Sequence, residues 1–275
     1  AGISPRIFGP GGSCAPHTLA PRIKETLGTC LRSRGYRTVA LYPVAGRFMD
    51  AKSTYKHYGI DEFYDPRNMG HPDPEFWHIP DDFFKEQAIR FLQDHNGPVP
   101  LFLVALTMGN HGPHGLKNRE ETPDCLSAKL PRKKARQLDD YLERLKKTDT
   151  AVEALTRYIM TRRRPTIFLY FGDHLPAFTD DMPDALFDAE RGVDKMKTTF
   201  HIRTNYPVVP PAVPHILDVS FLSGLILDVA QLNDSPFFMF NSFMRNHMNG
   251  KMPMQADSDP YVNSYFARIV NQIKR

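Results

Sequence analysis

The sequence predicts an α/β fold in which strands alternate with helices. Three apolar runs of strand length, at residues 36–44, 101–108 and 166–171, are separated by stretches whose apolar residues recur at helical spacing. This alternation favours a mostly parallel sheet flanked by helices on both faces. A chain of 275 residues that is 41% hydrophobic can bury a sizeable core. No internal repeat is visible.

The first part of the chain is expected to form a helix and a strand. Residues 1–17 are rich in Gly and Pro and predict a loop. A helix is predicted over residues 21–33 because three apolar residues recur every four positions there, namely Ile23, Leu27 and Leu31. The strand at 36–44 follows it, and a short helix is expected around residues 53–58.

The next segment is expected to be a loop at residues 60–80 that leads into a helix. Asp81 or Asp82 is the predicted N-cap of this helix, which is expected to stop at Asn96-Gly97. The residues expected on its buried face are Phe84, Ala88, Phe91 and Leu92. The strand at 101–108 follows directly.

A long helix is predicted over residues 132–160, after a polar loop at 116–131. Its buried stripe is interrupted by Asp149 and consists of Leu138, Leu142, Leu145, Val152, Leu155 and Ile159. The remaining expected elements are a polar insertion, a strand and two helices, at residues 176–196, 199–209, 219–230 and 260–274. Pro207 weakens the strand, and the Met-rich stretch 239–254 is assigned no element.

Asp173 and His174 stand side by side where the strand at 166–171 ends. The strand stops at Gly172, and a glycine there allows a sharp turn. An oxygen and a nitrogen ligand suit Zn²⁺ or Mn²⁺, so the pair predicts a metal site. The plainer alternative is that Asp173 caps the following segment and that His174 is an ordinary loop histidine.

A second polar cluster follows the strand at 101–108. It consists of Asn110, His111 and His114 in a loop punctuated by Gly and Pro. Alone, this loop would be interpreted as a turn with solvated histidines. In open α/β sheets, however, ligands bind outside the carboxyl ends of the strands. We therefore expect both loops to face one crevice.

Charge and cysteine content exclude some classes of protein. The net charge is +4 and the basic residues are mostly scattered, which argues against nucleic-acid binding and allows only a modest preference for anionic substrates or lipid surfaces. Cys14, Cys30 and Cys125 form no metal-binding pattern. Cys14 and Cys30 pair if the compartment is oxidising; otherwise all three are thiols. No apolar run reaches the roughly 20 residues that span a bilayer.

The order of the motifs resembles that of the lipoteichoic-acid-synthase-like phosphoglycerol transferases, which belong to the alkaline phosphatase and sulfatase superfamily. The motifs are LGTCLRSRGYRTVALYPVAGRFMDAKSTYKHYGIDEFYD, WHIPDDFFKEQAIRFL, LFLVALTMGNHGPH and PTIFLYFGDHLP. They lie within residues 16–245, and NHGPH followed by GDHLP is their specific part.

This resemblance implies the superfamily fold over residues 1–275 as a single catalytic domain. It also implies one divalent metal, Mn²⁺ or Zn²⁺ with Mg²⁺ as a further candidate. The metal-binding Asp-His pair of the family falls on Asp173 and His174. The family histidine that contacts the phosphate or glycerol of the substrate falls on His111, and Asn110 and His114 are expected to bind substrate beside it.

Two residues of the family find no match, the nucleophilic threonine and a metal-binding glutamate. On the resemblance, residues 1–4 follow the nucleophile helix, and the chain does not begin with Met. We therefore expect a fragment or processed form that lacks an N-terminal part with a membrane segment. Such a fragment is expected to be inactive in isolation, with or without its metal.

The loop at residues 42–52 departs from the family, which often carries an aromatic residue and an Arg there to hold the phosphoglycerol. This chain has Phe48, Met49, Asp50 and Ala51 at that place. Arg47 is the candidate for binding the substrate phosphate, with Lys52 as the alternative. Residues 14–18, CAPHT, loosely resemble the C-x-P-S-R signature of sulfatases, but mismatches at the Ser and Arg positions count against it.

The function that the resemblance implies is metal-dependent transfer of phosphoglycerol, or a related phospho-alcohol, to a cell-envelope lipid or polysaccharide. The reaction is expected at the extracytoplasmic, periplasmic face of a bacterial inner membrane, through a phospho-threonine intermediate. One alternative is a sulfatase or phosphodiesterase that uses water as acceptor. Another is a non-catalytic binding domain, which holds if the natural chain begins here.

Overall fold

The computed structural model describes residues 3, 15–115, 130–178, 197–252 and 258–274. It confirms the predicted α/β class, with a parallel sheet and helices. The chain forms two compact units. Unit 1 comprises residues 1–75, 94–106 and 206–275, and unit 2 comprises residues 76–93 and 107–205.

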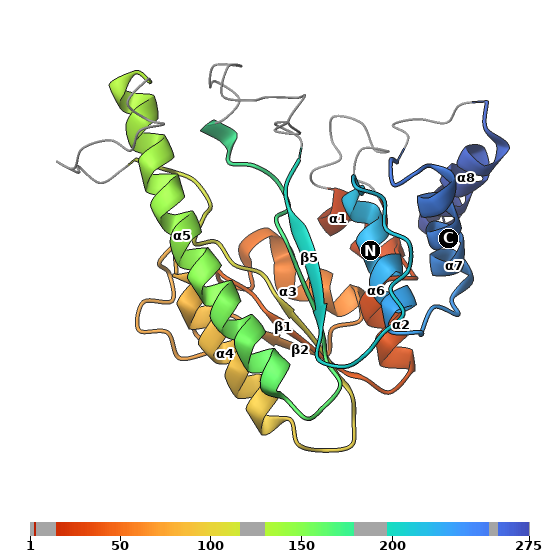
Figure 1. Cartoon of the computed structure of the whole chain (residues 1–275), viewed down its shortest axis with the longest axis horizontal. Helices are drawn as coiled ribbons and strands as arrows, with labels where there is room; N and C mark the ends of the chain where they lie inside the picture. The colour runs from red at the N-terminus through yellow and green to blue at the C-terminus, as the bar shows by residue number, and fades with distance from the viewer. Residues whose placement is uncertain (1–2, 4–14, 116–129, 179–196, 253–257, 275) are drawn as a thin grey trace. The chain divides into compact units, whose positions relative to one another are not determined.

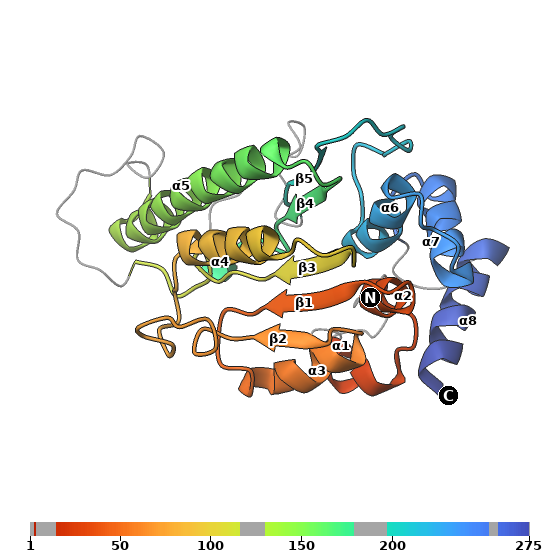
Figure 2. The same ribbon diagram turned by 90° about the horizontal axis from the view of Figure 1, so that it is seen from below.

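Unit 1 is built on a three-stranded parallel sheet in the order β2-β1-β3 (Figure 2). The central strand β1 (Arg37–Leu41) pairs with β2 (Glu62–Tyr64) on one side and with β3 (Leu101–Ala105) on the other. Four of the five β1 residues are buried, as is typical of a central strand in a parallel sheet.

Strand β2 corrects the expectation of a loop over residues 60–80. Its Glu62 accepts two hydrogen bonds from Arg37 of β1, at 2.5 and 2.8 Å. Three residues are too few to show the alternation from which strands are predicted. Edge pairing of this kind is therefore invisible in the sequence.

The helix predicted over residues 21–33 is divided in the structure. A 3₁₀ turn at Ala20–Arg22 is followed by α2 (Leu27–Ser33). Thr26 is the N-cap of α2, since its Oγ1 accepts from the Thr29 N–H at 3.0 Å and Thr29 Oγ1 accepts from the Thr26 N–H at 2.8 Å. This capping box fixes a helix start at Leu27 and separates it from the preceding turn.

The start of α2 lies against the end of α3 (Ala51–His57). Thr26 Oγ1 donates to the Tyr58 carbonyl at 2.6 Å. A Cβ atom on Gly28 would lie 2.2 Å from the same carbonyl oxygen, so only glycine fits at this position.

The helices at the end of the chain supply much of the core of unit 1. They are α6 (Leu222–Val229), α7 (Pro236–His247) and α8 (Pro260–Lys274), and α1 (Ala15–Thr18) is a single turn near the start. Helix α7 was not predicted. It buries Phe237, Phe238 and Met244, whereas Met239 is 55% exposed. Cys30 is a free, buried thiol in this core; Cys14 and Cys125 lie outside the described residues.

Unit 2 contains most of α4 (Asp81–Asp94), all of α5 (Arg132–Thr161), and the antiparallel pair β4 (Ile167–Phe171) and β5 (Phe200–Thr204). Helices α4 and α5 lie side by side in Figures 1 and 2, and Thr148 Oγ1 of α5 donates to Asp81 Oδ2 at 2.6 Å. Asp81 is buried and is the first residue of α4.

The buried face of α5 differs from the predicted stripe. Ala135, Thr148, Ala151 and Ile159 are buried, whereas Leu145 is 37% exposed. On α4, Phe84 and Ala88 are buried as predicted, and Phe91 and Leu92 are half-buried. The predicted loop and insertion fall mostly on residues 116–129 and 179–196, which lie outside the described residues. Within the described ranges, no helix is long and apolar enough to cross a membrane.

Candidate functional site

Asp173 and His174 follow the last residue of β4 and Gly172. Gly172 is not in the left-handed region, which corrects the expectation of a sharp glycine turn. Its missing side chain instead allows the close approach of Thr198, whose Cβ would lie 3.3 Å from a Cβ on Gly172. Thr198 Oγ1 donates to the Gly172 carbonyl at 2.6 Å. The residue before the Asp-His pair is thus held against the segment that leads into β5.

The two side chains of the pair lie on the surface, 66% and 61% exposed, with Asp173 Oδ2 and His174 Nε2 3.6 Å apart. The His174 N–H donates to Asp173 Oδ1 at 2.9 Å, which is the capping contact of the plainer alternative. Two donors that bind one tetrahedral ion at about 2.1 Å lie about 3.4 Å apart. The separation in this pair therefore suits a shared cation.

The protonation of His174 also suits metal binding. Its Nδ1 lies 2.7 Å from the Leu175 carbonyl, which can only accept, so Nδ1 carries the proton. In the neutral ring, Nε2 then has a free lone pair facing Asp173. The residues present thus fit two of the ligands of a divalent ion. In the part of the chain that the structure describes, no group of three His, Cys, Asp or Glu side chains could hold a metal.

His111 is exposed in the loop that follows β3 (the second loop) and lies beside the Asp-His pair. The centroids of its ring and of the His174 ring are 6.3 Å apart, and the ring planes meet at 83°. Its other ring neighbour is Trp77, at 5.6 Å. His111 Nδ1 donates to the Gly112 carbonyl at 2.8 Å, which again leaves Nε2 as the nitrogen with the lone pair.

Asn110 and His114 lie on either side of His111 in the loop and have different surroundings. Asn110 Nδ2 donates to Thr148 Oγ1 at 2.7 Å, and its Oδ1 is buried with no hydrogen-bond partner. Through Thr148 the loop is connected to Asp81, whose pKa is raised mainly by burial. Substrate binding by Asn110 stays a prediction.

His114 is buried, with a side-chain exposure of 3%. Its ring packs edge-on against Tyr141 and Phe178, at 5.6 and 5.1 Å between centroids, and neither ring nitrogen has a hydrogen-bond partner. Burial and, second, the charge of Arg144 lower its pKa to about 4. His114 is therefore neutral near pH 7, and its predicted contact with substrate is untested.

Arg47 belongs to unit 1, where it lines a hollow of about 740 Å³. Its side chain is 79% exposed and forms an ion pair of 3.5 Å with Glu75. Phe48 and Met49 beside it are also exposed, at 42% and 47%. The lining of the hollow includes four basic residues, Arg47, Lys52, Lys56 and Arg67.

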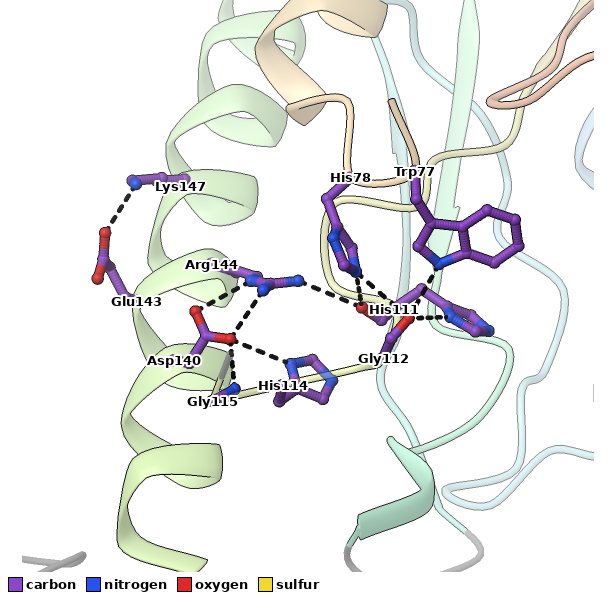
Figure 3. Close-up of polar contacts among 10 residues, drawn as sticks. All are labelled: Trp77, His78, His111, Gly112, His114, Gly115, Asp140, Glu143, Arg144 and Lys147. Atoms are coloured by element: carbon purple, nitrogen blue, oxygen red, sulfur yellow. Dashed lines mark hydrogen bonds and ion pairs between the residues drawn. The ribbon is translucent and has the colours of Figure 1, made fainter. Parts of the chain in front are cut away.

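Four residues that were not named as site candidates from the sequence contact the second loop, which follows β3 (Figure 3). They are Trp77, His78, Asp140 and Arg144. Trp77 and His78 lie in a segment predicted as plain loop, and Arg144 lies among the many charged residues of α5. Two signals were available. Trp77 and His78 begin the WHIPDDFFKEQAIRFL motif of the resemblance, and Asp140 and Arg144 have the i,i+4 spacing that is common on helix surfaces.

Comparison with solved structures defines the class of fold. The phosphoglycerol transferase GacH of Streptococcus pyogenes, solved with sn-glycerol-1-phosphate, superposes with a TM-score of 0.61 at 18% identity, over 87% of this chain and 60% of that one. The lipoteichoic acid synthase LtaP of Listeria monocytogenes gives a TM-score of 0.53 at 18% identity, over 72% and 50%. These likenesses confirm the predicted sulfatase and alkaline-phosphatase-like fold.

The chain belongs to the sulfatase family, whose model matches residues 1–206. An uncharacterized protein of Haemophilus influenzae is 29% identical over 266 residues, which cover 94% of this chain and 48% of that protein. A lipoteichoic acid synthase of Staphylococcus saprophyticus is 25% identical over 155 residues, which cover 52% and 22%. The chain thus spans about half, or less, of the length of these relatives.

Proposed function

We propose that this chain is the catalytic part of a metal-dependent transferase that moves phosphoglycerol, or a related phospho-alcohol, onto a cell-envelope lipid or polysaccharide. The observation that carries the proposal is the convergence of three side chains. Asp173 and His174 stand at the distance that a shared cation needs, and the His111 ring lies beside His174. The similarity to a phosphoglycerol transferase and to lipoteichoic acid synthases supports the choice of reaction.

Asp173 and His174 are the proposed metal ligands. Their oxygen and nitrogen donors favour Mn²⁺ or Zn²⁺ over Mg²⁺, which prefers oxygen ligands. When bound, such an ion lowers the pKa of a coordinated hydroxyl and stabilises negative charge on phosphoryl oxygens. The further ligands required by the family pattern, including the nucleophile, are not among the motifs found in this chain.

His111 is the proposed catalytic residue for proton transfer. Because its Nδ1–H is bound to the Gly112 carbonyl, Nε2 is the atom that exchanges protons with substrate. In the protonated form it donates to the leaving alkoxide or to a phosphoryl oxygen; in the neutral form it accepts a proton from the attacking hydroxyl. Its exposure on the loop leaves Nε2 open to a substrate.

Arg47, Asn110 and His114 are proposed to contribute to substrate binding, each from a different setting. Arg47 is one of four basic residues in a hollow that also contains three carboxylates, Asp50, Asp65 and Glu75, and the small excess of positive charge suits a phosphate. Asn110 and His114 flank the proposed catalytic histidine. The proposed location is the extracytoplasmic, periplasmic face of the envelope, where the lipid and polysaccharide substrates of such a transferase are found.

The experiment uses the protein as expressed from its native gene, with whatever residues flank this sequence. Phosphatidylglycerol vesicles are the donor, and the products are followed as diacylglycerol and phosphoglycerol. Transfer is expected to release diacylglycerol and to leave the phosphoglycerol on an envelope glycolipid or glucan supplied as acceptor. EDTA should stop the reaction, and Mn²⁺ or Zn²⁺ should restore it.

Two results would contradict the proposal. Release of free glycerol phosphate alone, or turnover of an aryl sulfate instead, would identify a hydrolase, the reaction that the name of the family suggests. Binding of donor vesicles without turnover under any metal condition would identify a binding domain.

A further inference from the structure

The two consecutive peptides that follow His111 are held by side chains from two other segments (Figure 3). The His111 carbonyl accepts from His78 Nε2 at 2.8 Å and from Arg144 Nη1 at 3.3 Å. The Gly112 carbonyl accepts from Trp77 Nε1 at 2.9 Å. Burial and, second, the charge of Arg144 lower the pKa of His78, so this ring is neutral and its single N–H is on Nε2.

Arg144 and Asp140 form a two-point ion pair on one face of α5. Arg144 Nη2 lies 2.7 Å from Asp140 Oδ2, and Arg144 Nε lies 3.2 Å from Asp140 Oδ1. Both side chains are less than one-fifth exposed. Burial alone would raise the Asp140 pKa, but the Gly115 N–H and Arg144 outweigh it and hold that pKa below its usual value. Asp140 is therefore charged at neutral pH.

The same ion pair holds the second loop at two points, His111 and Gly115. Asp140 Oδ2 accepts from the Gly115 N–H at 2.8 Å, and Arg144 donates to the His111 carbonyl. Each contact is made to the backbone, so it fixes the path of the loop whatever side chains the loop carries. The guanidinium is suited to this task because its planar fork offers donors to a carboxylate and to a carbonyl at once.

We infer that Arg144 and Asp140 are positioning residues for His111, an inference that rests on the function proposed for His111. The His111 ring is anchored through its Nδ1–H to the Gly112 carbonyl. This carbonyl belongs to the Gly112–Pro113 peptide, which directly follows the His111–Gly112 peptide that Arg144 and His78 hold. Holding the first peptide restrains the second, and with it the tautomer of the ring and the direction of Nε2. Loss of Arg144 removes the contact of α5 with the His111 carbonyl and leaves His78 as its donor, so the peptide should become less restrained and Nε2 less well directed, without loss of any group that touches substrate.

Helix α5 supplies a matched control. Glu153 and Arg157 form an i,i+4 ion pair of 2.7 Å, as Asp140 and Arg144 do, but their side chains are 67% and 73% exposed. An exposed pair of this kind contributes little to stability. Arg157→Met therefore removes the same type of ion pair from the same helix.

The test measures transfer kinetics of the native protein with phosphatidylglycerol vesicles as donor. Arg144→Met is expected to lower kcat roughly 10- to 100-fold, which is the range for residues that orient a functional group without contacting substrate. The KM should be nearly unchanged. Arg144→Lys should not restore activity, because an ammonium cannot bind the carboxylate at two points and also reach the carbonyl. Arg157→Met should leave kcat unchanged.

A double-mutant cycle separates positioning from a general loss of structure. If Arg144 acts through His111, Arg144→Met should have no further effect in the His111→Ala background. An equal loss of kcat in both backgrounds would overturn the inference. If His111→Ala alone keeps full activity, it is instead the proposed function that fails, and the two failures are thereby distinguished.

A readout besides activity is the tautomer of His111. The ¹⁵N shifts of its ring in the wild-type protein should show the proton on Nδ1, and Arg144→Met should give a mixture of tautomers. An unchanged tautomer together with unchanged kcat would overturn the inference.

If Arg144→Met unfolds the protein, Asp140→Asn takes its place. This variant keeps an oxygen for the Gly115 N–H and removes the charge that holds Arg144. It should change the tautomer and kcat as Arg144→Met is expected to do, and no change in either would overturn the inference.

Discussion

The imidazole rings of His111 and His174 meet almost at a right angle, 83°, with their centroids 6.3 Å apart. The two residues are 63 positions apart in the sequence and lie in the loops that follow two different strands. Both rings have Nδ1 turned to a backbone carbonyl, which leaves Nε2 as the reactive nitrogen in each. The proposed metal ligand His174 and the proposed proton-transfer group His111 are thereby next to each other.

Removal of the Asp-His pair should abolish metal binding. Asp173→Ala and His174→Ala each delete one of two donors that stand 3.6 Å apart, so the affinity of the native protein for Mn²⁺ or Zn²⁺ should fall at least 10- to 100-fold, the loss that follows even from changing a supporting residue. Isothermal titration with the metal alone measures this directly.

A second Asp-His pair serves as the control for this experiment. His247 Nε2 and Asp259 Oδ2 lie 2.7 Å apart at the ends of α7 and α8 in unit 1. Asp259→Ala should leave the metal affinity unchanged. Equal losses from Asp173→Ala and Asp259→Ala would show that the titration reports unspecific binding to carboxylates.

Replacement of His111 should affect transfer but not the metal. His111→Ala is expected to lower kcat about 10²- to 10⁴-fold, the usual contribution of a general acid or base. Metal affinity and melting temperature should stay at their wild-type values, because the ring is exposed and contributes little to the core. His215→Ala, at another exposed histidine, is the matched control. Near-normal transfer by His111→Ala would make His111 a structural residue of its loop.

The longest helix was predicted from the sequence, whereas some shorter elements, α7 among them, were not. Helix α5 was expected over 132–160 and runs over Arg132–Thr161, because eight turns of amphipathic pattern leave little ambiguity. Strand β2 and the break before α2 were missed. Strand β2 depends on the backbone pairing of three residues with β1, and the start of α2 depends on the hydrogen bonds between Thr26 and Thr29. Apolar spacing carries no information about either.

The candidate site was predictable where it depends on strand ends. The rule that ligands bind beyond the carboxyl ends of strands singled out His111, Asp173 and His174, and the structure brings the three together. Asp173 and His174, however, follow a strand of the antiparallel pair β4-β5 and not a strand of the parallel sheet, as had been expected. The side chains behind them were not predictable. Arg144 and Trp77 bind backbone carbonyls, and any residue can present a carbonyl, so no pairing of side-chain types marks these contacts in the sequence.

Thr148 is expected to be important for stability, since its hydroxyl connects α4 to the second loop. It donates to Asp81 Oδ2 at 2.6 Å and accepts from Asn110 Nδ2 at 2.7 Å, and it is only 4% exposed. Thr148→Val keeps the shape but leaves both partners without this hydrogen bond, which costs about 1–3 kcal/mol for a buried polar group. Urea unfolding of the 275-residue chain measures the loss.

The control for Thr148 is Thr150, which is exposed and bonds only to the Lys146 carbonyl of its own helix among the contacts resolved, at 3.0 Å. Thr150→Val should change the free energy of unfolding by a few tenths of a kcal/mol at most, as is usual for surface positions. Similar losses from both variants would mean that helix propensity, and not the buried hydrogen bond, is being measured.

The burial of His114 should make the stability of the protein depend on pH in a defined window. Its pKa is about 4 in the folded state and about 6.5 in an unfolded chain. Between these values the unfolded state binds more protons, so the free energy of unfolding should fall as the pH drops from about 6.5 to about 4, by on the order of 3 kcal/mol in total.

His114→Phe should reduce this slope, because phenylalanine can pack against Tyr141 and Phe178 without taking up a proton. Urea unfolding of wild type and variant across this pH range measures the difference between their slopes. Parallel curves would contradict the prediction, because they would mean that His114 is protonated equally easily in the folded and unfolded states.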